Sequence, residues 1–133
     1  MKKIKPFFVL LILIITLLVG CGNNDDTIQT CIISNISYPS QSKIETATQI
    51  DTLTANEAIY ASIHFIESPK GMEYTVKWYL DGTEIKSETK STVNDTQDVV
   101  VYELEAEQAD AGTLKVEVLF KNTVLKSQEV KIQ

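Results

Sequence analysis

The chain has 133 residues and a mass of 14.9 kDa, which is enough for one domain of ordinary size. It contains 12 Lys, no Arg and 18 Asp or Glu, so its formal net charge at pH 7 is −6. An acidic chain without arginine lacks the planar bidentate donor that suits phosphate groups, and its charge repels nucleic acid. We therefore expect no nucleic-acid partner.

The N-terminal segment has the layout of a secretory signal. Three lysines among the first five residues precede an apolar run at 7–19, in which Thr16 is the only polar residue. A membrane-spanning helix needs about 20 apolar residues, so this run is short for a stable span. We expect residues 1–20 to be a signal peptide that is removed on export.

The end of this leader resembles the bacterial lipobox. Leu18, Val19 and Gly20 directly precede Cys21. In lipoproteins of this kind a dedicated peptidase cuts before the cysteine, whose thiol carries a diacylglyceryl group. The resemblance implies that Cys21 anchors the protein to the extracytoplasmic face of the cell membrane, since two acyl chains on one residue give stable binding to a bilayer. An ordinary signal peptide with Cys21 placed there by chance, or an uncleaved anchor, are the alternatives.

Residues 21–43 are expected to hold the lipidated cysteine, a short tether and a candidate first strand. The tether, GNNDDT at 22–27, is polar and should be flexible. Once Cys21 is acylated, Cys31 has no partner within the chain, so we expect no disulfide. Cys31 is then best interpreted as a small buried residue, with pairing between molecules as the alternative.

Alternating apolar and polar residues predict β-strands over most of the remaining chain. The predicted strands are 59–65, 74–80, 84–89, 99–105, 114–120 and 124–132, with weaker candidates at 30–37 and 44–54. Asp81-Gly82 favours a tight type I′ hairpin. Residues 102–111 also favour a helix, and a short helical turn between two strands fits both patterns. About seven short strands indicate an all-β antiparallel sandwich.

Two segments resemble immunoglobulin-like domains. VKWYLDG at 76–82 and DAGTLKV at 110–116 resemble strands C and F of that family, and most of all the bacterial modules found on surface lipoproteins. The resemblance implies an immunoglobulin-like β-sandwich over residues 44–133, in which hydrocarbon packing replaces the usual disulfide between the sheets. It supplies no active site. The expected core residues are Ile63, Phe65, Trp78, Leu114 and Val116.

No motif for catalysis, a metal or a cofactor is predicted. His64 is the only histidine, and it has no second ligand or nucleophile of the right type in the sequence. Glu103, Glu105 and Glu107 would share one strand face, where neighbouring side chains stand about 7 Å apart and do not converge. A solvated acidic face is the main interpretation, and a calcium site or a glycosidase-like carboxylate pair is the alternative.

Three apolar or aromatic side chains are predicted to point outward as a possible binding patch: Tyr60, Tyr79 and Leu119. An apolar patch can mark a binding site, although single exposed apolar residues are normal. We expect a non-catalytic binding or assembly module at the cell envelope, with an envelope protein or polysaccharide as ligand. The alternatives are a small hydrolase or accessory protein that uses the acidic face, and a passive structural spacer.

Overall fold

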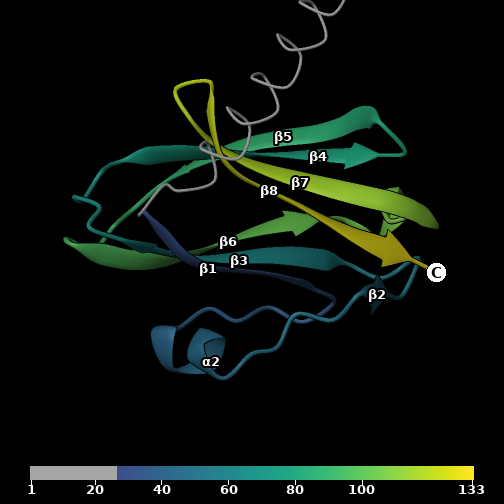
Figure 1. The fold of residues 1–133 in the computed structure, drawn as a ribbon, viewed down its shortest axis with the longest axis horizontal. Coiled ribbons are helices and arrows are strands. Elements are labelled where there is room, and N and C mark those ends of the chain that lie inside the picture. Colours follow the sequence, from purple (N-terminus) through teal and green to yellow (C-terminus); the bar gives the residue numbers. More distant parts are fainter. Residues whose placement is uncertain (1–26) are drawn as a thin grey trace, which may run out of the picture.

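The computed structural model describes residues 27–133, in which eight strands form two packed sheets (Figure 1). The predicted signal peptide, the lipobox and Cys21 lie outside the described residues. The three-stranded sheet has the order β1-β3-β6, with β1 at Ile28–Ser34, β3 at Ile59–Ile66 and β6 at Gln97–Leu104. The five-stranded sheet has the order β2-β8-β7-β4-β5, with β2 at Thr52–Leu53, β4 at Glu73–Leu80, β5 at Thr83–Ser91, β7 at Gly112–Phe120 and β8 at Thr123–Ile132.

The predicted all-β sandwich is confirmed, because every strand pair is antiparallel except the short parallel pair of β2 and β8. The predicted helical turn is also present. Strand β6 ends at Leu104, a single 3-10 turn, η1, spans Ala106–Gln108, and β7 starts at Gly112. Within residues 27–133, no helix is both long enough and apolar enough to cross a membrane.

The N-terminal part of the sandwich differs from the prediction in its bounds. Strand β1 confirms the weaker strand candidate at 30–37, but it pairs with β3, so the predicted start of the sandwich at residue 44 is wrong. The predicted strand at 44–54 is also wrong over most of its length. Its beginning belongs to the short helix α2 (Gln41–Glu45), and only Thr52–Leu53 is a strand. The physical reason is that this segment packs Ile44 against the outer face of the three-stranded sheet and does not add a strand to either sheet there.

The core lies between the two sheets and contains all five residues that the sequence placed there. Ile63, Phe65, Trp78, Leu114 and Val116 are each at most 1% exposed. They belong to one apolar cluster that includes residues of both sheets. Cys31 is a free thiol in the same cluster, so among the described residues hydrocarbon packing joins the sheets without a disulfide.

The hairpin between β4 and β5 has a turn of the predicted kind. Asp81 and Gly82 have φ values of 49° and 89°, which is the pair of left-handed residues that a type I′ turn needs. Asp81 Oδ1 also accepts a hydrogen bond of 2.9 Å from the Thr113 amide. Gly112 makes this contact possible, because a Cβ at that position would lie 2.8 Å from Asp81 Oδ2.

Burial of Cys31 gives the fold a specific weakness at alkaline pH. Desolvation raises the pKa of the Cys31 thiol from 9.0 to about 12, and the charge of Lys126 lowers it only in part. Above pH 9 the unfolded chain loses this proton while the folded chain keeps it, so stability falls as the pH rises. We expect the free energy of unfolding to fall with a slope approaching about 1.4 kcal/mol per pH unit from this group.

Urea unfolding of the wild type and of Cys31→Ala at pH 8, 9 and 10 measures this slope. The variant should be less stable at pH 8 because of the cavity it creates, but its stability should decline less steeply with pH. Equal slopes in the two proteins would contradict the assignment. Tyr102, whose pKa is also raised by burial, is present in both proteins, so the difference between their slopes reports on Cys31.

Candidate functional site

The structure does not bring the predicted binding patch together. Tyr60 lies on β3 of the three-stranded sheet and Tyr79 on β4 of the five-stranded sheet, and each alternates with core residues, so the two side chains point away from opposite sheets. The prediction that Leu119 is exposed is wrong, since this residue is only 6% exposed. It follows a register shift in the β7–β8 pairing and lies between Thr75 and Val124.

Tyr79 is engaged by its own neighbours. Its hydroxyl donates a hydrogen bond of 3.1 Å to Glu117 Oε1, and Lys115 Nζ lies 4.7 Å from the centre of its ring. Desolvation and then the hydrogen bond to Glu117 raise the pKa of Tyr79. This part of the surface is a small polar cluster, so it does not offer a free aromatic platform.

The predicted acidic strand face is also not formed. Strand β6 ends at Leu104, so Glu105 follows the strand and Glu107 belongs to η1. Glu105 is paired with Lys86 at 3.0 Å, and the hydrogen bond from Lys86 lowers the pKa of Glu105. A carboxyl group that acts as a general acid near neutral pH needs a raised pKa instead. Within residues 27–133, no group of three or more His, Cys, Asp or Glu side chains is placed to hold a metal ion.

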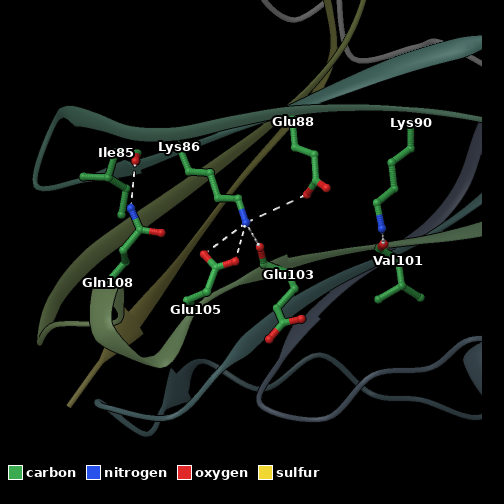
Figure 2. A network of polar contacts seen from close by, with 8 residues as sticks. All are labelled: Ile85, Lys86, Glu88, Lys90, Val101, Glu103, Glu105 and Gln108. Atoms are coloured by element: carbon green, nitrogen blue, oxygen red, sulfur yellow. Dashed lines mark hydrogen bonds and ion pairs between the residues drawn. The ribbon is translucent and has the colours of Figure 1, made fainter.

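The side of the sandwich where β5 faces β6 is bridged by lysines (Figure 2). Lys86 and Lys90 on β5 pair with Trp78 and Tyr74 on β4. Directly opposed residues of antiparallel strands point to the same face, so these lysines point toward the core side of the sheet. At this edge of the sandwich the two lysine side chains extend across to β6 of the three-stranded sheet.

These lysines end on backbone oxygens of β6. Lys90 Nζ donates a hydrogen bond of 2.7 Å to Val101 O, and Lys86 Nζ donates to Glu103 O and to the Glu105 carboxylate. Figure 2 shows the two ammonium groups lying between the strands. Both charges on this lysine-bridged side are therefore committed to contacts within the molecule.

The opposite side, where β1 faces β8, is closed by one glutamine. The Gln49 amide donates to Ile33 O and accepts from Ile33 N, each at 2.8 Å, as a residue of a neighbouring strand would. Gln49 Oε1 also accepts a hydrogen bond of 2.8 Å from Gln128 on β8. One side chain thus joins β1, the edge strand of the three-stranded sheet, to β8 of the five-stranded sheet.

Residues 35–51 cover the outer face of the three-stranded sheet. In Figure 1 this segment, with α2 in its middle, runs below β1 and β3 on the side away from the five-stranded sheet. The Tyr38 amide donates a hydrogen bond of 2.9 Å to Ser62 Oγ on β3. As a result Ser62 and His64 are almost fully buried, although strand alternation placed His64 on an outward face.

A cavity of about 280 Å³ opens at the margin of this cover, and we refer to it as the His64 pocket. Residues 39–41 of the covering segment line it together with His64 of β3, the start of β6 and Asn94. His64 Nε2 lies 2.9 Å from Gln97 Oε1, a neighbour on the same face of the sheet. The sequence did not predict this pocket, because its walls come from segments far apart in the chain.

Comparison with known proteins identifies the fold. No protein-family model and no curated protein matches the chain. An immunoglobulin-like protein from Pseudomonas aeruginosa is similar, with a TM-score of 0.51, 12% identity, and coverage of 84% of this chain and 98% of that chain. The CARDB domain of a Pyrococcus furiosus protein, solved in complex with di-metal ions, has a TM-score of 0.40 and 15% identity, with coverage of 82% and 96%. A beta-glucosidase from Listeria innocua has a TM-score of 0.43 and 16% identity over 62% of this chain and only 14% of its own.

At these identities the likeness concerns the fold alone. The predicted immunoglobulin-like β-sandwich without a disulfide is confirmed for the described residues.

Proposed function

We propose that this chain is a lipid-anchored protein of the cell envelope and that it acts, without catalysis, as a binding or assembly module. The proposed anchor is Cys21, within the pattern Leu18-Val19-Gly20-Cys21. The observation that carries the binding role is the His64 pocket, an open cavity with polar side chains in its wall. A passive spacer, the simplest alternative, would have no use for such a cavity.

The position of Thr27 supports the anchored arrangement. Thr27 O accepts a hydrogen bond of 2.7 Å from the Ile66 amide, so the chain enters the sandwich at the end where β3 finishes. Only residues 21–26 separate the proposed lipid from this end, and six extended residues span about 20 Å. The His64 pocket is at the same end, because β6 begins there with Gln97 opposite Ile66.

The hydrolase alternative receives no support from the acidic residues. Such an enzyme would need two carboxylates facing one substrate, one of them with a raised pKa. Glu105 is instead held by Lys86 with a lowered pKa, and Glu107 lies on a different element from Glu103.

Metabolic labelling tests the anchor. Cells that express the wild type and are fed labelled palmitate should give a labelled protein in the membrane fraction, and Cys21→Ala should abolish the label, because the thiol that accepts the diacylglyceryl group is gone. Cys31→Ala is the matched control and should remain labelled, since Cys31 is buried in the core. An unlabelled wild type, or equal labelling of Cys21→Ala, would rule out the proposed anchor.

A further inference from the structure

The hydrogen bond of the His64 side chain determines which nitrogen of its ring carries a proton. A glutamine carbonyl oxygen can only accept, so the contact with Gln97 Oε1 at 2.9 Å requires a proton on His64 Nε2. In the neutral ring the other nitrogen, Nδ1, is then an acceptor. No residue of 27–133 hydrogen-bonds to Nδ1, although the His64 side chain lines the pocket and is only 2% exposed. The His64 side chain that lines the pocket therefore carries an acceptor that suits a hydroxyl or amide donor of a ligand.

The charge of the pocket favours a neutral ligand. Asp98 is the only carboxylate among the described residues that line it, and no lysine lines it. The Asp98 carboxylate already accepts hydrogen bonds from the Val93 amide and from the Asn94 amide and side chain, at 2.7, 3.2 and 2.9 Å. An anion would find no cation here, and a cation would have to compete with these three donors.

The size and the remaining walls favour one small ring. The cavity volume of about 280 Å³ is just below the range of roughly 300–1,000 Å³ that is usual for drug-sized ligands. Pro39 and Val99 contribute apolar surface, and Ser40 and Gln97 contribute a hydroxyl and an amide. A sugar ring has the matching character, because its C–H face is apolar and its hydroxyl groups both donate and accept hydrogen bonds.

We propose that the His64 pocket binds one ring of a neutral saccharide, with Nδ1 of His64 accepting a hydrogen bond from a sugar hydroxyl. This inference rests on the proposed role as a binding module and names the ligand class of that role. A polysaccharide of the envelope would offer such rings within reach of a domain held near the membrane by residues 21–26.

The single histidine of the chain makes the test direct. In the full-length protein labelled with ¹⁵N only in histidine, every imidazole signal comes from His64. The probes are glucose and N-acetylglucosamine, which are neutral, and glucuronate and glucosamine, which carry the same ring with a negative or a positive charge. We expect a saturable shift of the Nδ1 resonance with a neutral sugar and at least tenfold weaker binding of both charged sugars.

Two substitutions on β6 provide a matched pair. Val99→Phe adds a ring inside the pocket and should weaken sugar binding at least tenfold, whereas Val101→Phe, two residues along the same face and outside the pocket, should leave it unchanged. A wild type that gives no saturable shift with either neutral sugar overturns the proposal, as does equal affinity for the charged sugars. These two readings need no substitution, so a folding defect in Val99→Phe does not affect them.

The same titration on Cys21→Ala separates this inference from the anchor. The pocket is built only from described residues, so we expect unchanged sugar binding in a protein that carries no palmitate. Failure of labelling with intact sugar binding would remove the anchor alone. Intact labelling with no sugar binding would remove the saccharide proposal alone.

Discussion

Replacing Trp78 with alanine should lower the free energy of unfolding by about 3–5 kcal/mol, the usual cost of removing a large aromatic residue from a core. The Trp78 side chain is 0% exposed and lies in the cluster shared by both sheets. The surrounding strands are fixed by their ladders and can close the resulting cavity only in part. Urea unfolding followed by far-ultraviolet circular dichroism measures the effect, because the variant no longer contains a tryptophan to report by fluorescence.

Two control variants make this prediction specific. Trp78→Phe should cost much less, since it keeps most of the aromatic volume and removes Nε1, a buried donor without a hydrogen-bond partner among residues 27–133. Val124→Ala, at an exposed position, should change stability by no more than about 0.5 kcal/mol. A loss below about 1 kcal/mol in Trp78→Ala would mean that the tryptophan is not the centre of this core.

Replacing Gln49 with alanine should lower the free energy of unfolding by about 2–4 kcal/mol, because it removes hydrogen bonds worth roughly 0.5–1.5 kcal/mol each and leaves buried groups without partners. Gln49 bonds to both backbone groups of Ile33, to the Ile50 carbonyl and to Gln128. Ile33 is 0% exposed, so water cannot easily replace the lost contacts.

Hydrogen exchange of the Ile33 amide gives a local measurement of the same change. Its protection should fall in Gln49→Ala together with global stability in urea. Gln41→Ala is the matched control, since Gln41 is an exposed glutamine on α2 whose side chain bonds to Glu45, and it should stay within about 0.5 kcal/mol of the wild type. Unchanged protection of Ile33 would show that the Gln49 amide does not close this edge.

The sequence pattern predicted the strands that have one face in the core. Residues 59–65 and 74–80 alternate because every second side chain enters the space between the sheets, and the predicted bounds differ from the observed ones by one residue. The turn at Asp81-Gly82 was predictable because only a few residue pairs tolerate two left-handed conformations in succession.

The functional surface was less predictable because it depends on contacts between distant segments. Alternation assumes a free outer face for β3, but residues 35–51 cover it and bury His64. Leu119 is opposite Thr75 in an unshifted part of the β4–β7 ladder, so it keeps the outward side that alternation assigns to it, yet it is only 6% exposed and lies outside the apolar cluster between the sheets. Periodicity within one strand assigns the side to which a residue points, but it does not reveal what covers that side.

The lysine-bridged side acquires further importance in the proposed membrane-anchored form. Confinement to a bilayer would bring many copies together in two dimensions, with their strand edges meeting far more often than in free solution. On β6 the carbonyl oxygens of Val101 and Glu103 already bind the ammonium groups of Lys90 and Lys86. A strand from a neighbouring copy would have to displace a charged group from each oxygen before it could add to the sheet. In that arrangement the lysines would oppose the addition of a strand from a neighbouring copy at the β6 edge.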